Sequence, residues 1–356
     1  MSSAELCLFC PKLCSFACPV SEETRKEAHT PWGKVSLAAL SAAPDASSAF
    51  AFGACTGCLA CTHHCPHEND APALLYRARA AAVRANAAPP VWTGLATAFA
   101  RKGHGQAGDL SGTMRALRAG ERTLDGAPLL FPGCAALAQG GDEVRDALSA
   151  ARALGAPLSL VPEGALCCGL ELVQGGHPEQ GEAHGGKVRA LLVRPRTPLH
   201  LVFLQAGCAR HVLEGWHLPE GSQVEHVTSY LARALVSRPG AARPPQLPGA
   251  AVFHDPCELA RGLRELTAPR AILGAIYALG VEEPAQCGVD TPCCGAGGLL
   301  PRTMPEVAQG MAARRKAELG PRPVTADPAC ALALGADEVV SVLARWLSAA
   351  PGKGAT

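Results

Sequence analysis

Short apolar runs alternate with amphipathic segments along the second half of the chain. The runs lie at residues 129–131, 201–204, 251–253 and 324–325. Residues 142–154 and 267–279 repeat apolar side chains every three or four positions, which is typical of a helix with one buried face. Gly155 and Gly280 follow these segments, and a glycine at this place ends many helices. Strands that alternate with helices predict an α/β fold with a mainly parallel sheet.

This alternation occurs twice. Cys134, the Cys167-Cys168-Gly169 triplet and Cys208 recur as Cys257, Cys293-Cys294-Gly295 and Cys330, at offsets of 123, 126 and 122 residues. Residues 227–235 also align with residues 339–347. We therefore predict a duplication, with repeat 1 at residues 127–237, repeat 2 at residues 250–349, and a proline-rich linker at residues 238–249.

The part before the repeats has a different pattern. A helix is expected at about residues 69–86, with Asn69 or Asp70 as its N-cap. Residues 1–86 are predicted as one helical domain and residues 87–126 as a connecting segment. Basic side chains gather here, and they either dock a partner or form an ordinary solvated face. They are Arg77, Arg79, Arg84, Arg101, Lys102, Arg115, Arg118 and Arg122.

Charge and hydropathy exclude several classes of protein. The chain has 32 basic and 31 acidic residues, whereas phosphate binding requires an excess of Lys and Arg. We therefore expect no nucleic-acid partner and no polybasic contact with a membrane. No apolar stretch is long enough to span a bilayer, and no export signal fits before Cys7. We expect a cytoplasmic protein that reaches an inner membrane only through partners.

The chain contains 17 cysteines, and close, repeated spacings in a cytoplasmic protein favour metal ligands over disulfides. Eight of them form two motifs that each end in Cys-Pro. The second motif has the bacterial ferredoxin spacing, in which the fourth cysteine ligates the other cluster of a pair. It consists of Cys55, Cys58, Cys61, Cys65 and Pro66. The first motif is one residue longer between its second and third cysteines, and it consists of Cys7, Cys10, Cys14, Cys18 and Pro19.

Two cross-ligated [4Fe–4S] clusters explain this spacing, because a cubane presents three iron corners to one short loop and takes a fourth ligand from elsewhere. Ferredoxin set 1, expected to hold cluster 1, is Cys7, Cys10, Cys14 and Cys65. Ferredoxin set 2, expected to hold cluster 2, is Cys55, Cys58, Cys61 and Cys18. Structural zinc is the alternative, but four cysteines per motif exceed what a zinc ribbon needs. A thioredoxin-like redox motif at Cys55 and Cys58 is a weaker alternative than structural zinc.

The repeats offer further ligand sets. Adjacent thiolates repel each other unless a metal neutralises them, and adjacent cysteines are poor disulfide partners. Repeat set 1 is Cys134, Cys167, Cys168 and Cys208, and repeat set 2 is Cys257, Cys293, Cys294 and Cys330. We expect Gly169 and Gly295 to allow close approach of the backbone to a cluster, and Gly295 to Gly298, including Gly297, to donate N–H groups to its sulfur. The alternative is a tight turn with buried thiols that act as small hydrophobic groups.

These motifs resemble a family of iron–sulfur oxidoreductases with cysteine-rich CCG domains, which includes the iron–sulfur subunits of glycolate oxidase, lactate utilisation and anaerobic glycerol-3-phosphate dehydrogenase, and heterodisulfide reductase. The resemblance rests on residues 131–134, 167–169, 254–257, 293–297 and 326–330, and on residues 30–34. It implies an α-helical two-cluster ferredoxin domain followed by two duplicated α/β CCG domains. The fuller CCG pattern has a fifth cysteine, where this chain has His211 and Ala333, and Cys287 is unassigned.

The resemblance implies an electron-transfer subunit that is not catalytic alone. A flavoprotein dehydrogenase would oxidise a 2-hydroxy acid such as glycolate or lactate, and a quinone or other carrier would accept the electrons. No dinucleotide-binding glycine motif follows a strand, so the hydride chemistry belongs to a partner. Two alternatives stay open: a thiol or disulfide reductase with a cluster in a CCG domain, and a zinc or structural scaffold. The expected cofactors are two [4Fe–4S] clusters, with one or two further clusters in the repeats.

Overall fold

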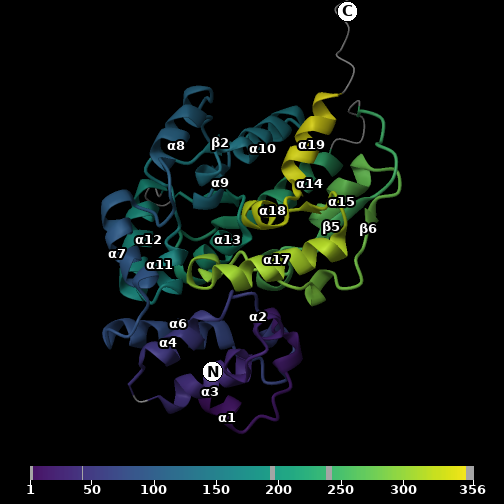
Figure 1. Cartoon of the computed structure of the whole chain (residues 1–356). Helices are drawn as coiled ribbons and strands as arrows, with labels where there is room; N and C mark the ends of the chain where they lie inside the picture. Colours follow the sequence, from purple (N-terminus) through teal and green to yellow (C-terminus); the bar gives the residue numbers. More distant parts are fainter. Residues whose placement is uncertain (1–2, 42, 193–196, 238–242, 350–356) are drawn as a thin grey trace, which may run out of the picture.

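The computed structural model describes residues 3–41, 43–192, 197–237 and 243–349. Its first part is helical and lies against one side of the α/β part (Figure 1). Capping side chains define several of these helices. Asp45 and Ser48 form a capping box, and Asp70 Oδ1 accepts a hydrogen bond from Ala73 N at 3.0 Å. The helices are α1 (Ala4–Leu8), α2 (Pro19–Thr24), α3 (Pro31–Leu40), α4 (Ala46–Gly53), α5 (Ala60–His63) and α6 (Ala71–Arg84), with 3₁₀ turns at Ser15–Ala17 and Glu27–His29.

The predicted helix at 69–86 is confirmed as α6, with Asp70 as its N-cap. The connecting segment contains two helices, α7 (Pro90–Lys102) and α8 (Leu110–Ala119). Asp109 caps α8 by accepting a hydrogen bond from Gly112 N at 2.9 Å. The buried residues Trp92, Leu95 and Phe99 of α7 join the main core, so this segment is a packed part of the fold.

Repeat 1 contains a parallel four-stranded sheet in the order β2-β1-β3-β4. Its strands are β1 (Leu129–Phe131), β2 (Ser159–Leu160), β3 (His200–Phe203) and β4 (Gln223–His226). Its helices are α9 (Cys134–Ala138), α10 (Asp142–Ala153), α11 (Leu170–Gln174), α12 (Pro178–Leu192), α13 (Ala206–Gly215) and α14 (Val227–Val236). The apolar runs predicted at 129–131 and 201–204 therefore form the two central strands.

Repeat 2 has the same topology, with the strand order β6-β5-β7-β8 and parallel pairing throughout. Its strands are β5 (Ala251–His254), β6 (Val281–Glu282), β7 (Val324–Thr325) and β8 (Asp337–Glu338). Its helices are α15 (Ala268–Ile276), α16 (Leu300–Thr303), α17 (Pro305–Leu319), α18 (Pro328–Leu334) and α19 (Val339–Ser348), with a π-helical turn at Glu258–Gly262 and a 3₁₀ turn at Gly288–Asp290. Two copies of one parallel α/β unit confirm the predicted fold class.

One predicted helix is shorter than expected. The segment 267–279 forms a helix only to Ile276, because Tyr277 is extended and pairs with Leu247. Leu247 N donates to the Ile276 carbonyl at 2.7 Å, and the Leu247 carbonyl accepts from Ala278 N at 2.9 Å. Leu247, which lies within the predicted linker, therefore pairs with residues that the periodicity assigned to the helix. Within the predicted linker, residues 238–242 lie outside the described residues.

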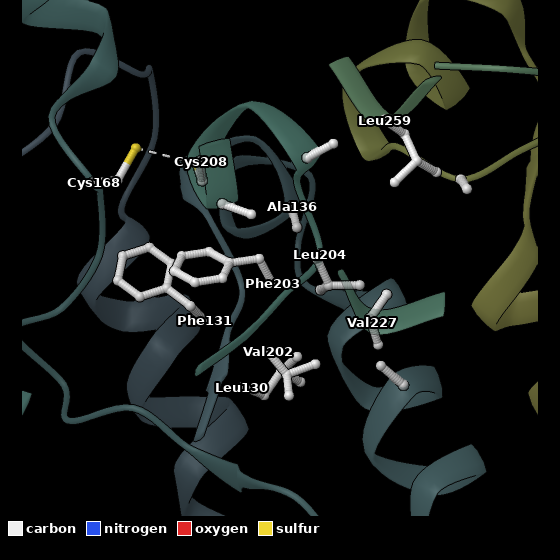
Figure 2. Close-up of a cluster of buried hydrophobic side chains, with 14 of the residues drawn as sticks. Leu130, Phe131, Ala136, Cys168, Val202, Phe203, Leu204, Cys208, Val227 and Leu259 are labelled. Atoms are coloured by element: carbon white, nitrogen blue, oxygen red, sulfur yellow. Dashed lines mark hydrogen bonds between the residues drawn. The ribbon is translucent and has the colours of Figure 1, made fainter. Parts of the chain in front are cut away.

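The two repeats share one hydrophobic core. Helix α10 packs against α19, and α14 packs against α15, so helices of both repeats lie side by side (Figure 1). In repeat 1, the buried rings of Phe131 and Phe203 on neighbouring strands stack with centroids 5.0 Å apart (Figure 2). Cys134 follows β1 and Cys208 lies in α13 after β3, so both cysteines lie beyond the carboxyl ends of parallel strands, where ligands of such sheets gather.

Candidate iron–sulfur centres

Ferredoxin set 1 is assembled from the two ends of the helical part. Burial, and then the charges of Cys7, Cys65 and Cys10, raise the pKa of Cys14 to about 11. Asn69 Nδ2 donates to Cys7 Sγ at 3.2 Å, and it is free to do so because Asp70 caps α6. Cys65 thus lies with the first motif, which is the arrangement that cross-ligation requires.

Ferredoxin set 2 surrounds a buried lysine. Cys18, Cys55, Cys58 and Cys61 line a small cavity of about 20 Å³ together with Lys34. The lysine is 2% exposed, and its Nζ lies 3.6 Å from Cys18 Sγ and 2.5 Å from the Ala54 carbonyl oxygen. Burial lowers the pKa of Lys34, but the negative charges of the four thiolates outweigh it, so that the pKa is raised. Cys18, from the first motif, therefore lies with three cysteines of the second.

The structure also brings the cysteines of each repeat set close together. In repeat set 1, Cys168 Sγ lies 3.2 Å from Cys208 Sγ, and a hydrogen bond joins Cys134 to Cys167 (Figure 2 shows the first pair). In repeat set 2, the Sγ atoms of Cys294 and Cys330 are 3.3 Å apart, and those of Cys257 and Cys293 are 3.9 Å apart. The CCG turns therefore place each adjacent pair between the cysteines that follow the two central strands.

Both repeat sets line a single cavity of about 670 Å³. Polar side chains are held in its wall: Arg302 Nη2 and Gln106 Nε2 donate to Glu171 Oε1 at 2.7 and 2.6 Å. Burial raises the pKa of Asp327, another wall residue, to about 6. The cavity therefore has eight thiols and several polar groups on its surface, and it is large enough for inorganic groups or a small molecule.

Ferredoxin set 2 contacts repeat set 2 directly. A hydrogen bond with Cys293, and then burial, raise the pKa of Cys58 well above its ordinary value. Arg261 is 9% exposed beside this contact, and its Nε donates to the Cys58 carbonyl at 2.6 Å. Its Nη1 donates to the carbonyls of Val289 and Thr291, whereas Nη2 has no hydrogen-bond partner among the described residues. A guanidinium therefore lies between two groups of sulfur atoms from different parts of the fold.

The glycines of the CCG turns have more specific roles than the sequence indicated. Gly169 and Gly295 adopt φ values of +92° and +89°, which favour glycine. Gly295 N donates to Cys293 Sγ at 3.4 Å, as expected. At Gly297 an added methyl group would lie 2.6 Å from the Thr56 carbonyl oxygen, and one at Gly298 would overlap the Cys55 carbonyl. These two glycines let repeat 2 pack against the backbone of ferredoxin set 2.

Several residues lie outside the four sets. Cys287 is near Glu283 and Asp255, and burial is the main cause of its raised pKa. A carbonyl contact places His211 beside Cys168, but burial and then Arg210 lower its pKa to about 4. Arg79 departs from the predicted docking stretch or solvated face, because it is fully buried and donates to the carbonyls of Phe52, Cys55, Gln174 and Gly298. It therefore joins ferredoxin set 2 to both repeats.

The residues fit iron–sulfur clusters better than disulfides or empty thiol pockets. All 17 cysteines are free. Burial and neighbouring sulfur hold most of the grouped thiol pKa values above normal, so these cysteines become stable thiolates only when metal compensates their charge. Lys34 and Arg261 are buried cations whose charges lie beside such sulfur, and Nη2 of Arg261 has no hydrogen-bond partner among the described residues. Zinc sites would not require this many thiols.

Comparison with known proteins agrees with this geometry. Residues 3–69 match the model of the 4Fe-4S dicluster domain, and residues 129–211 and 251–335 each match the cysteine-rich domain known as CCG. The protein is thus a multi-cluster iron–sulfur protein, with a helical dicluster domain followed by two CCG domains.

Several relatives are named as subunits of reductases. The chain is 27% identical over 194 residues to one subunit of the dihydromethanophenazine:CoB–CoM heterodisulfide reductase of Methanosarcina mazei. The matched region covers 52% of this chain and 46% of the relative. It is 28% identical over 163 residues to one subunit of the fumarate reductase (CoM/CoB) of Methanothermobacter marburgensis, covering 45% of this chain and 30% of the relative. The match therefore spans less than half the length of either relative. In the described part of the chain, no helix has the length and apolar character needed to cross a membrane.

Proposed function

We propose that this chain is the electron-transfer subunit of an oxidoreductase, with [4Fe–4S] clusters bound by ferredoxin sets 1 and 2 and a further cluster bound by each repeat set. Bound clusters would supply one-electron transfer. The observation that carries the proposal is the contact between Cys58 and Cys293, which brings ferredoxin set 2 against repeat set 2. These two cysteines link the ligand sets without intervening protein. Repeat set 1 continues the series across the shared cavity.

The partners follow from the chemistry that the chain lacks. A series of thiolate sites moves single electrons and cannot accept a hydride, so a flavoprotein partner would oxidise the substrate and deliver electrons one at a time. The motifs that resemble glycolate oxidase support a 2-hydroxy acid as that substrate and a quinone or other carrier as the acceptor. The chain would then be inactive alone and would meet any membrane through its partners.

The shared cavity favours a second candidate, a thiol or disulfide reductase. Its wall combines two thiol sets with the Glu171–Arg302 pair, and such a site can hold a small polar molecule between two electron donors. The relatives named as heterodisulfide reductase components support it too. Against it stand His211 and Ala333, which occupy the positions of the fifth cysteines. A thiol-dependent change in the EPR spectrum of a repeat cluster would favour this candidate.

The test is Cys58→Ser in the complex isolated with its natural partners, with Cys287→Ser as the matched control because Cys287 lies outside all four sets. We expect Cys58→Ser to lower iron by about four per chain, the content of one [4Fe–4S] cluster, and to stop electron flow to the acceptor. Cys287→Ser is expected to keep both. Full iron and full turnover in Cys58→Ser would refute the proposed ligand set and the series built on it.

A further inference from the structure

A histidine and an arginine form a buried pair in repeat 2, behind repeat set 2. His254 ends β5, three residues before Cys257, and is 1% exposed. Arg315 on α17 is 2% exposed, and its Nε lies 3.2 Å from His254 Nδ1. Because a guanidinium can only donate, Nδ1 accepts this hydrogen bond, and the ring hydrogen of the neutral imidazole must be on Nε2. Arg315 is itself fixed by Glu318 and by the Gln286 carbonyl.

His254 also lies beside two sulfur atoms of repeat set 2. A ring nitrogen of His254 and the Sγ atoms of Cys294 and Cys330 all lie within 4.8 Å of one another. Nε2 has no hydrogen-bond partner among the described residues. A buried donor without a partner costs about 1–3 kcal/mol, so buried N–H groups are nearly always paired. The acceptor that this position offers is the sulfur of whatever repeat set 2 binds.

Repeat 1 lacks this pair. The residue three positions before Cys134 is Phe131, whose ring stacks on Phe203 (Figure 2). Helices α12 and α17 have 15 residues each and both begin with proline, so Arg315 on α17 corresponds to the buried Val188 on α12. The charged side chains beside the two thiol sets also differ in sign. The negative charge of Glu171 lies beside Cys134 and Cys167, whereas the positive charge of Arg261 lies beside Cys257 and Cys293.

We propose that His254, oriented by Arg315, donates a hydrogen bond to sulfur of a cluster held by repeat set 2, and so raises its reduction potential above that of the cluster in repeat 1. The inference rests on the proposed function, since it needs a cluster in each repeat. The couple takes up one electron, with no bond broken and no proton transferred. A hydrogen bond to sulfur stabilises the reduced, more negative state. Arg315 is thus the positioning residue, and His254 is the hydrogen-bond donor that makes the two similar sites unequal in potential.

The test replaces His254 with the residue that repeat 1 uses. We expect His254→Phe to keep its iron and to shift one cluster to a more negative potential. At a fixed applied potential, the ratio of oxidised to reduced forms of this cluster should change at least tenfold, which corresponds to a shift of 59 mV for one electron. His254→Gln retains an N–H donor and should shift less. The potentials of the ferredoxin-type clusters in the same sample should not shift. His226 in repeat 1 has both ring nitrogens already paired, so His226→Gln should leave the potential of the repeat 1 cluster unchanged.

Other results would overturn the inference. Unchanged potentials in His254→Phe would exclude the hydrogen bond, and loss of about four iron ions in both variants would make His254 a ligand. If His254→Phe does not fold, pulsed EPR of the unmodified protein with ¹⁵N-labelled histidine decides. A weak coupling with an exchangeable proton supports the proposal, whereas a strong coupling or none contradicts it. The iron content of the unmodified protein distinguishes failure of this inference from failure of the proposed function. Too little iron for a cluster in repeat 2 would refute both.

Discussion

At the scale of single residues, buried basic side chains from separate segments of the fold lie beside the thiols of the ligand sets. The ligand sets follow from spacing, because ferredoxin motifs and repeated CCG turns constrain which thiols meet. Lys34, Arg261 and the His254–Arg315 pair approach the sulfur sets from other segments of the fold. Lys34 does appear in the resembling stretch 30–34, but an isolated lysine gives no sign of being buried. Only the packed structure reveals these partners.

Lys34 is expected to balance the charge of ferredoxin set 2. Replacing it with methionine keeps most of its apolar length and removes the buried cation. Removing one partner of a buried ion pair costs about 3–5 kcal/mol, so we expect Lys34→Met to lower the free energy of unfolding by about that amount and to make the cluster 2 potential more negative. Denaturant unfolding and EPR redox titration measure both. The exposed Lys26→Met is the control, and a Lys34→Met protein that matched it would show that the lysine does not balance the thiolates.

The buried thiols predict a pH dependence that appears only without metal. The pKa of Cys208 is raised to about 11 and that of Cys330 to about 12, above the value of 9.0 for a free thiol. A group whose pKa is raised by folding contributes its full stability below pH 9 and loses it as the pH rises towards 11 or 12. Cluster-free protein should therefore lose roughly 1–2 kcal/mol per buried thiol between pH 8 and pH 10.5.

This dependence is measured by urea unfolding of reduced, cluster-free protein at both pH values. Protein with its clusters should show no such loss, because its cysteines are already thiolates compensated by iron. Equal stability of the cluster-free protein at pH 8 and pH 10.5 would contradict the burial of these thiols.

At the scale of elements, the duplication was predictable and its local exceptions were not. Alternating apolar runs and cysteine offsets predicted both parallel sheets. The end of α15 depends on Leu247, a residue of the predicted linker that pairs with Tyr277. Gly297 and Gly298 of the second CCG turn also pack on the backbone of residues 55 and 56, a contact that the sequence did not indicate. Both exceptions arise from long-range contacts, which local periodicity does not encode.

The close packing of this turn gives a prediction for Gly298. It has a φ of +63°, and an added methyl group would overlap the Cys55 carbonyl and the backbone of Thr56. We expect Gly298→Ala to lower the free energy of unfolding by at least about 1–3 kcal/mol, because strained left-handed backbone and overpacking both contribute. Gly274→Ala in α15 is the matched control, since nothing lies within 4 Å of its added methyl group. Thermal unfolding of the two variants tests this, and equal melting temperatures would contradict a tight contact at residue 298.

At the scale of the whole molecule, the arrangement of the parts carries the functional argument. The sequence predicted a ferredoxin-like domain and two repeats as separate units. It did not predict that Arg79 would bind carbonyls of all three, that Cys58 would meet Cys293, or that both repeat sets would face one cavity. The contacts of Arg79 with the two repeats join residues 95 and 219 positions apart, so they depend on the final packing of the domains.

The central claim is that both CCG repeats bind clusters and extend the ferredoxin series. The most direct measurement is iron and acid-labile sulfide per chain, on protein purified without oxygen, with EPR of its oxidised and reduced states. We predict about sixteen iron ions and about sixteen sulfides, four of each for every [4Fe–4S] cluster. About eight of each would confine the clusters to the ferredoxin sets and contradict the claim, and zinc without sulfide would contradict the iron–sulfur assignment as a whole.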